Sequence, residues 1–463
     1  MKNDANDFKG LNAFALMFFI IILAGLMTYF IPAGSYERVE VDNRSIVNPE
    51  SFSYTESEPV GPLELFNSFH MGMVEGANII LFVFLFGGAL GIMEKTGAIE
   101  ALVKMTTAKF HSKEKVLIPI LILLFSLLGS LIGSAEDALI YIAIIMPLTI
   151  ALRLDALTGF AIVFLGILGT GFTSGITNPF SVGVAQIIAE LPMYSGIAIR
   201  IAIFILFYTV TVIFIFRHVN SIKKNPALAV YGKYSSADIP KIDYNYKMKK
   251  SNALSLIIFA LGFGLLIYGV IALEWYIGEI AGVFLMSAVL MGIISRLSPN
   301  SMADGFIKGS KDMVSGALII GFAQTILVIL ESGHLLDTIL HFSANILDTL
   351  PTTIAAAGMF ITQLFINLVV PSGSGQAALT MPVMSPLADL LGITRQTAIV
   401  AFQLGDGISN TIIPTSGVLL ASLSIAGIPY MKWVKWILPY FIIQTILGII
   451  IVMIAQTFQL GPF

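Results

Sequence analysis

The chain has 463 residues, of which 57% are hydrophobic and only 11% are charged, and it contains no cysteine. A soluble protein carries roughly twice that charged fraction, so the composition excludes an ordinary globular enzyme. The lack of cysteine excludes disulfides, a Cys-based zinc site and an iron–sulfur cluster. The formal net charge of -3, without a long basic run, argues against nucleic acid as a partner. The composition is that of a polytopic membrane protein.

A helix that crosses a bilayer needs about 20 apolar residues. Uninterrupted stretches of about this length occur at 11–33, 73–93, 195–217, 251–273, 279–297, 313–331 and 433–457. Four other apolar stretches are interrupted near their middle by Gly, Ser, Thr, Asn, Pro or carboxylates: 114–153, 157–190, 351–391 and 396–427. We expect the first stretch to be a retained helix, because its apolar run is longer than that of a signal peptide.

Loop charges predict the orientation, because cytoplasmic loops carry an excess of Lys and Arg. Segments 94–115 and 217–250 are rich in these residues and are predicted to be cytoplasmic, as is the N-terminus. Segments 34–72 and 332–350 are predicted to be external. The polar segment 218–250 is a linker that separates an N-terminal half (1–217) from a C-terminal half (251–463).

The two halves resemble each other. Short motifs recur in the same order: Met-Val-x-Gly-Ala at 73–77 and 313–317, Met-Pro at 146–147 and 381–382, and Pro-x-Ser at 179–181 and 414–416. The repeats, roughly residues 66–217 and 306–457, place the corresponding loops 94–115 and 332–350 on opposite sides. Inverted repeats with helices broken at matching places are typical of secondary transporters.

We therefore predict an all-α polytopic membrane protein with inverted repeats, two re-entrant hairpins and two broken helices. The first hairpin consists of 114–132 and 137–152 and enters from the cytoplasm. The second consists of 351–370 and 376–391 and enters from outside. Residues 114–190 and 351–427 would form a transport domain that slides against a scaffold made of the remaining spans.

The hairpin turns (129–137 and 371–376) and the broken helices (169–179 and 405–417) contain most of the polar residues within the apolar stretches. Irregular backbone at membrane depth is tolerated only where it is buried or lines a cavity. Half-helix N-termini can bind a carboxylate, and freed carbonyls and hydroxyls can coordinate Na⁺. Packing glycines and ordinary kinks would explain one such break, but four related breaks favour a binding site.

The sequence predicts two sets of site residues. The substrate-binding set is Ser134, Glu136, Asp137, Thr173, Asn178, Ser372, Ser374, Asp406, Asn410 and Thr415. The ion-binding set, for Na⁺, is Gly133, Thr177, Gly373, Ser409, Thr411 and Ser416.

The acidic residues expected nearest to mid-depth are Glu136, Asp137 and Asp406. An Asp there costs about 2.5–3.5 kcal/mol, so a functional role is the default hypothesis. These carboxylates would bind a substrate cation, ligate Na⁺ or carry a proton, whereas Glu136 and Asp137 have the alternative role of capping a helix. No Lys or Arg is expected in the core, which favours a substrate that bears positive charge.

Four motifs together resemble the YfcC-type carriers, which are grouped with the anaerobic dicarboxylate carriers of the ion transporter superfamily: Phe-Ile-Pro-Ala-Gly-Ser-Tyr at 30–36, Asn-Pro-Phe-Ser-x-Gly at 178–183, Pro-Ser-Gly-Ser-Gly at 371–375 and Ile-Pro-Thr-Ser-Gly at 413–417. The resemblance implies a carrier of the bacterial cytoplasmic membrane, often dimeric, that works as an elevator. It implies dicarboxylates as substrates or, in some branches, arginine in exchange with ornithine. The superfamily's Ser-Asn-Thr motif lies at hairpin tips, whereas Ser409-Asn410-Thr411 lies in a predicted helix break.

The expected function is secondary active transport of a small charged metabolite, an amino acid (basic or otherwise) or a carboxylate, by an elevator mechanism. The transport would be coupled to Na⁺ or H⁺ or proceed by exchange, with the bilayer and a second copy of the chain as partners. A Na⁺- or H⁺-coupled dicarboxylate carrier is the alternative. An ion channel and an intramembrane hydrolase are disfavoured, the latter because the chain lacks Gly-x-Gly-Asp and Gly-x-Ser-Gly motifs. No enzymatic activity and no organic cofactor are expected.

Overall fold

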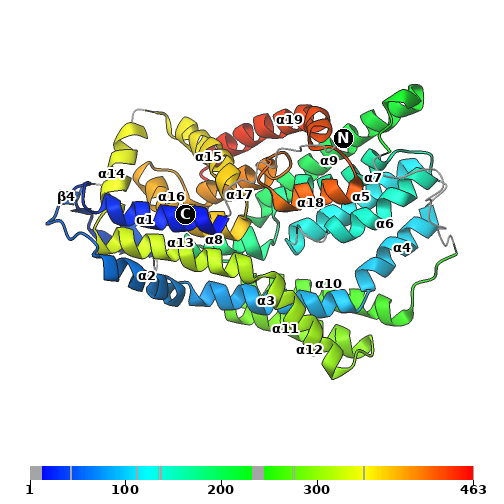
Figure 1. Ribbon diagram of the computed structural model, residues 1–463, viewed down its shortest axis with the longest axis horizontal. Helices are drawn as coiled ribbons and strands as arrows, with labels where there is room; N and C mark the ends of the chain where they lie inside the picture. Colours follow the sequence, from blue (N-terminus) through cyan, green and yellow to red (C-terminus); the bar gives the residue numbers. More distant parts are fainter. Residues whose placement is uncertain are drawn as a thin grey trace, which may run out of the picture.

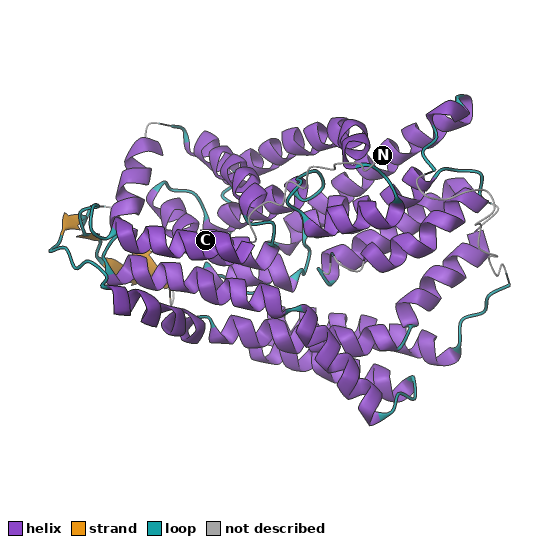
Figure 2. Cartoon of the chain, viewed as in Figure 1, coloured by secondary structure: helices purple, strands orange, loops and turns teal. Residues whose placement is uncertain are grey.

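The computed structural model describes residues 13–461 except 42–43, 49, 111–112, 134, 136–137, 232–244, 274, 276 and 348–349. The chain is almost entirely helical, with a few short strands at one end (Figure 2). The helices form two groups that lie against each other along the length of the molecule (Figure 1).

The first group contains the helices that begin each half of the chain: α1 (Ala13–Met27), α2 (Pro62–Glu75), α3 (Ala77–Lys95), α10 (Lys250–Leu273), α11 (Ile277–Ile294), α12 (Pro299–Asp312) and α13 (Val314–Ser332). Its packing is reciprocal, because α3 packs against α12 while α2 packs against α13. The pair α2–α3 carries the same repeat motif as α12–α13. The two repeats therefore make equivalent contacts with each other.

Glycines let α3 and α12 approach until their backbones touch. A Cβ atom on Gly309 would overlap the carbonyl oxygen of Gly87, and one on Gly91 would overlap that of Gly305. Small residues at such positions allow close van der Waals packing of helices within a bilayer, where no hydrophobic force holds helices together. We refer to the first group as the scaffold group.

The second group contains the two helical hairpins, the two broken helices and the long helix that closes each repeat. Its elements from the first repeat are α5 (Glu114–Leu131), α6 (Ala138–Ala151), α7 (Ala156–Phe164), η1 (Leu165–Phe172), η2 (Pro179–Gly183), α8 (Val184–Ile188) and α9 (Ile197–Lys224). Those from the second are α15 (Thr352–Val369), α16 (Gly373–Leu390), α17 (Arg395–Ser409), α18 (Gly417–Ala426) and α19 (Tyr430–Thr457). We refer to them as the hairpin group.

The closing helices α9 and α19 pack on the hairpins and broken helices of their own group. Helix α9 lies against η1 and α5, and α19 lies against α15 and α17. The two groups meet mainly where α16 packs against α13. Helices α4 (Ala98–Phe110) and α14 (Leu336–Leu347) also touch both groups, because α4 packs on α5 and α10 while α14 packs on α13 and α16. A short helix, η3 (Pro226–Leu228), follows α9.

Within the described ranges, 6 helices are long and apolar enough to cross a membrane: α3, α5, α9, α11, α13 and α19. Five of them lie in the uninterrupted apolar stretches, and the remaining one, α5, is the first arm of the first hairpin. Several shorter apolar helices, including parts of α1, α10 and α15, accompany them. These lengths and compositions agree with a multi-pass membrane protein.

The all-α prediction holds for nearly the whole described chain, and short strands occur only in the segment after α1. Strand β1 (Gly34–Ser35) pairs with β4 (Ser53–Tyr54), and β2 (Arg38–Val41) pairs with β3 (Arg44–Val47), both antiparallel. The sequence Arg-Val-Glu-Val followed by Arg-Ser-Ile-Val is rich in β-branched residues, which favour strands. Arg38 and the backbone N–H of Tyr36 both bind the carboxylate of Asp337, which fastens this segment to α14.

Candidate functional site

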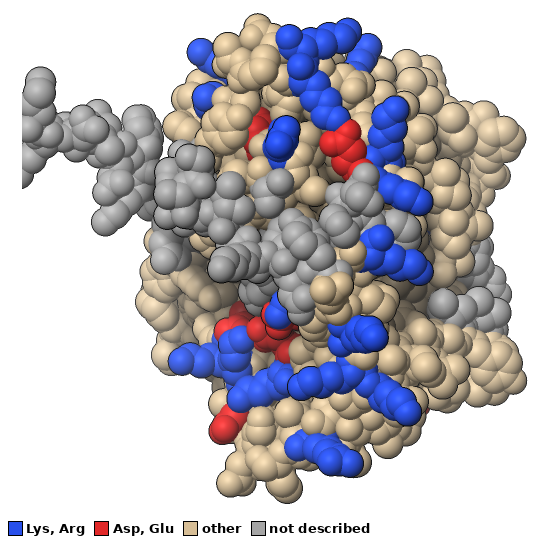
Figure 3. Space-filling view, turned by 90° about the vertical axis from the view of Figure 1, so that its right-hand side faces the viewer, with Lys and Arg blue, Asp and Glu red and all other residues tan. Residues whose placement is uncertain are grey.

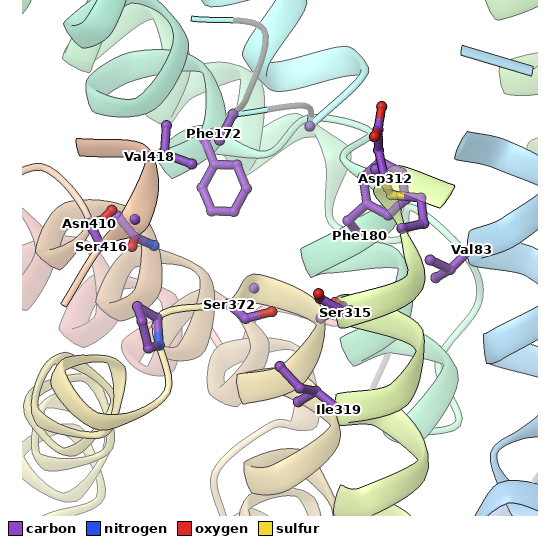
Figure 4. A pocket seen from close by; sticks show the side chains of 18 of the residues that line it. Val83, Phe172, Phe180, Asp312, Ser315, Ile319, Ser372, Asn410, Ser416 and Val418 are labelled. Carbon is purple, nitrogen blue, oxygen red and sulfur yellow. The ribbon is translucent and has the colours of Figure 1, made fainter. Parts of the chain in front are cut away.

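A cavity of about 300 Å³ lies between the scaffold group and the hairpin group (Figure 4). One wall contains residues from both hairpin turns and both helix breaks: Gly133, Ala135, Phe172, Phe180, Pro371, Ser372, Gly373, Ser374, Asn410, Ser416, Gly417 and Val418. The opposite wall belongs to the scaffold group and includes Val83, Asp312, Met313, Ser315, Gly316 and Ile319. Four segments that are far apart in sequence therefore converge on one central cavity.

The first broken helix is interrupted at residues 175–178, and polar groups satisfy the freed backbone. Oδ1 of Asn178 accepts hydrogen bonds from the N–H groups of Phe180 (2.9 Å) and Ser181 (3.2 Å), which starts η2 with Pro179 at its first position. Oγ of Ser130, near the end of α5, accepts a hydrogen bond from the N–H of Ile176 at 2.9 Å. The break is therefore held against the first hairpin.

Gly133 connects this hairpin to the break. Its φ is +76°, a conformation that favours glycine, and a Cβ atom there would overlap Oδ1 of Asn178. The hairpin backbone thus lies directly on the capping amide. A side chain at position 133 would separate the two elements.

Two helix N-termini of the second repeat open at the cavity. Ser372 caps α16 by accepting a hydrogen bond from the N–H of Gly375 at 3.3 Å, and Ser416 caps α18 by accepting one from Leu419 at 3.4 Å. Both serines line the cavity. Helix N-termini carry partial positive charge and free N–H groups, so this side of the cavity favours an anionic group.

Asp406 lies in α17 behind the cavity wall and is fully buried. Its Oδ1 accepts a hydrogen bond of 2.7 Å from Asn410, whereas Oδ2 has no hydrogen-bond partner in the described part of the chain. A Cβ atom on Gly373 would lie 2.9 Å from this Oδ2 and 3.2 Å from Cβ of Ser181, whose buried hydroxyl is also unpartnered. An isolated buried carboxylate is costly, so this arrangement suits a bound proton or cation.

The structure separates the predicted site residues into three sets. Those that line the cavity are Gly133, Ser372, Gly373, Ser374, Asn410 and Ser416. Those that are buried in the surrounding helices and breaks are Thr173, Thr177, Asn178, Asp406, Ser409 and Thr411, and Thr415 is exposed outside the cavity lining. Ser134, Glu136 and Asp137 lie outside the described residues.

The buried hydroxyls hold the backbone of the breaks. Oγ1 of Thr173 donates to the carbonyl of Leu168 at 2.8 Å, and Oγ1 of Thr411 donates to that of Ile408 at 2.7 Å. Hydroxyl groups used in this way satisfy carbonyls that the helix break leaves free. Their side chains face their own helix turns rather than the cavity.

Sequence reasoning missed several residues of the cavity wall, including Phe172, Phe180, Asp312 and Ser315. The two phenylalanines flank the first break, where only polar residues were sought. Asp312 directly precedes the repeated Met-Val-x-Gly-Ala motif. This position beside a recurring motif is the one sequence feature that points to Asp312 as a candidate site residue. Scaffold residues can be assigned to the site only from the packing of α13 against α16.

The expectation that the core contains no Lys or Arg is wrong. Arg200, near the start of α9, is only 1% exposed. Its Nε donates to the carbonyl of Ile176 at 3.2 Å and its Nη2 donates to that of Tyr194 at 2.8 Å. Loop-based reasoning placed position 200 near a span end, but the guanidinium group turns inward and binds the carbonyl that the first break exposes.

A second cavity, of about 500 Å³, adjoins the first, and both are lined by Asp312 and Met313. It is lined by the end of α3, the start of α4 and the end of α12, and it includes Glu94, Glu100 and Lys308. We call it the vestibule. It lies toward the end of the molecule where Lys and Arg side chains are spread over the surface (Figure 3).

Comparisons with known proteins agree with this architecture. The chain is 33% identical to "Putative basic amino acid antiporter YfcC" of Escherichia coli, over 95% of this chain and 93% of that protein. It is 27% identical to a protein of Haemophilus influenzae, over 96% of both chains.

Two solved structures share the fold. The YdaH transporter of Alcanivorax borkumensis has a TM-score of 0.71 at 15% identity, covering 97% of this chain and 100% of that one. MtrF of Neisseria gonorrhoeae, from a class of antimetabolite efflux pumps, has a TM-score of 0.72 at 16% identity, covering 98% of this chain and 96% of that one.

Finally, the profile of the C4-dicarboxylate anaerobic carrier family, DcuC, matches residues 12–457. The resemblance drawn from the motifs is thus confirmed, and the chain belongs to the C4-dicarboxylate anaerobic carrier family of membrane transporters.

Proposed function

We propose that the chain is a secondary active transporter that moves a small charged metabolite across the bacterial cytoplasmic membrane by an elevator movement of the hairpin group against the scaffold group. The observation that supports this most strongly is the central cavity. Both hairpin turns and both helix breaks form one of its walls, and α3, α12 and α13 form the other. A site at the junction of two separately packed groups can be exposed to one side of the membrane and then to the other.

In the proposed orientation, the lysine-rich end of the molecule faces the cytoplasm. The vestibule then connects the central cavity to the cytoplasmic side. The conformation is inward-open in this proposal, and the two hairpins are re-entrant. The domain that moves comprises residues 114–190 and 351–427, and it carries α9 and α19, which pack on it.

The substrate that we favour is a basic amino acid, moved by exchange or together with a coupling ion. Its carboxylate would meet the N-termini of α16 and α18, whose caps Ser372 and Ser416 line the cavity. The name of the Escherichia coli relative supports this choice. A C4-dicarboxylate is the second candidate. The family description favours it, and the two helix N-termini offer one site for each carboxylate.

Asp406 is the proposed coupling site, for H⁺ or Na⁺. Its unpartnered Oδ2 lies beside Gly373 at the start of α16, so a change in its charge would alter how the second hairpin packs. The hydroxyl of Ser181 is the second oxygen available to a cation there.

We also propose a homodimer, which native mass spectrometry of the protein in detergent would test.

Ligand-induced thermal stabilisation of the purified protein tests the proposed substrate class. A ligand that binds only the folded state raises the melting temperature by mass action. We expect a rise with arginine, ornithine or lysine, followed by saturable counterflow of the same compound in proteoliposomes. A rise with C4-dicarboxylates alone, and only with Na⁺ present, would reject the amino acid and support the second candidate. Single-channel currents in planar bilayers would reject a carrier altogether.

A further inference from the structure

The central cavity has different electrostatic character on its two sides. Among the described residues that line it, Asp312 is the only one with a charged side chain. It lies on the opposite side of the cavity from Asn410 and Ser416, which belong to the second break at the start of α18 (Figure 4). The cavity therefore has an acidic side and a side that favours anions because of its helix N-termini.

The carboxylate of Asp312 is available to a ligand. It is exposed, and within the described chain no hydrogen bond or ion pair engages it. Lys308, one helical turn earlier in α12, forms its ion pair with Glu94 at 2.9 Å instead.

Asp312 also lies where the two cavities adjoin, because it lines both the central cavity and the vestibule. A solute that moves between them passes this carboxylate. Since Asp312 is the last residue of α12, it belongs to the scaffold group and would not travel with the hairpin group. It can meet the solute only while the cavity is open to the vestibule.

We propose that Asp312 is a specificity-determining residue, which selects solutes with a cationic end as they enter or leave through the vestibule. This inference rests on the proposed function. The cationic end of the solute pairs with Asp312 while its carboxylate meets the N-termini of α16 and α18. Because Asp312 is exposed and its ion pairs are screened by solvent, loss of the carboxylate lowers the preference for a cationic solute about threefold to fivefold.

Arginine and citrulline are the matched probes, because a neutral ureido group replaces the guanidinium group at nearly the same shape. The experiment measures exchange in proteoliposomes of known orientation for the wild type, Asp312→Asn and Asp304→Asn. Asp304 is an exposed carboxylate of the same helix that lines neither cavity, so it controls for the general effect of charge on α12. Thermal melting of each variant checks that it folds.

We expect Asp312→Asn to raise the KM for arginine about threefold to fivefold on the vestibule side and to leave the KM for citrulline unchanged. The KM of Asp312→Asn for arginine on the opposite side of the membrane should match the wild type. For Asp304→Asn, the KM for arginine and the KM for citrulline should both match the wild type. Unchanged arginine-to-citrulline discrimination in a folded, active Asp312→Asn protein would overturn this inference alone. A wild-type protein that exchanges carboxylates and no basic amino acid would overturn the proposed substrate as well.

Discussion

Asn410 donates a hydrogen bond of 2.7 Å from Nδ2 to Oδ1 of Asp406, four residues earlier in the chain. Asn410 lines the central cavity while Asp406 is fully buried behind it. The bond therefore links the cavity surface to the buried carboxylate. A ligand that displaces Asn410 would change the surroundings of Asp406, which would connect the proposed substrate site to the proposed ion site.

Asp406→Asn removes the only ionisable group that the described residues supply to the proposed coupling site. We expect uptake driven by a Na⁺ or pH gradient to fall to background, because the amide can neither bind a proton nor balance a cation. Expression and the melting temperature should stay close to those of the wild type, since an asparagine keeps an oxygen for Asn410. The measurement is uptake into proteoliposomes with each gradient imposed separately. Gradient-driven uptake near the wild-type rate would remove Asp406 from the mechanism.

Gly373→Ala tests the close packing of the second hairpin turn. A Cβ atom there would lie 2.9 Å from both Oδ2 of Asp406 and Cζ of Phe172, so the turn must shift. Overpacking of this kind costs about 1–3 kcal/mol, and we expect transport to fall about tenfold. Gly358→Ala is the control in the same hairpin, because open space surrounds its Cβ position in α15. Equal rates for the two variants would show that the packing at Gly373 is unimportant.

Arg200→Met removes the donors that hold the first break. The carbonyls of Ile176 and Tyr194 would lose their charged partner, and we expect the free energy of unfolding to fall by about 2 kcal/mol. Arg200→Lys should recover only part of this, because one ammonium group cannot reproduce the planar fork. The readout is the melting temperature in detergent, with Arg217→Met, an exposed position of the same helix, as the control. A melting temperature for Arg200→Met equal to that of the control would contradict the assigned role.

Asp155 gives a pH-dependent contribution to stability. Burial alone would raise the pKa of Asp155, but hydrogen bonds from His218, Thr158 and the N–H of Val230 together hold this pKa below its ordinary value. The stabilisation is therefore complete above the unfolded-state pKa of about 3.9 and is lost as the pH falls through the lower folded-state pKa. We expect Asp155→Asn to melt at a lower temperature than the wild type at pH 7.

The difference in melting temperature between Asp155→Asn and the wild type should shrink as the pH is lowered below about 4. Asp304→Asn, at an exposed position, should follow the wild-type curve throughout. A difference that stays constant from pH 7 to pH 3 would show that the folded protein does not favour the ionised form of Asp155.

The sequence alone was sufficient for the membrane class, the family and the segments where helices break. Each of these depends on local properties, such as apolar length, Pro and Gly within an apolar run, and motifs that recur in order. Asn178 and Pro179 illustrate this, because an amide cap followed by proline starts a half-helix wherever the segment is placed. Ser372 and Ser416 were predicted only as site residues, and the structure places them at the starts of α16 and α18.

Only the tertiary structure decided which polar residues share the cavity. Thr173 and Thr411 have the same chemistry as the cavity serines, but the direction of each side chain around its helix turns it toward a backbone carbonyl. Asp312 and Arg200 lie near element ends in the sequence, and the packing of α12 and α9 places one beside the cavity and the other in the core. Local patterns determine where a helix stops, whereas the neighbours that a side chain meets depend on contacts between residues hundreds of positions apart.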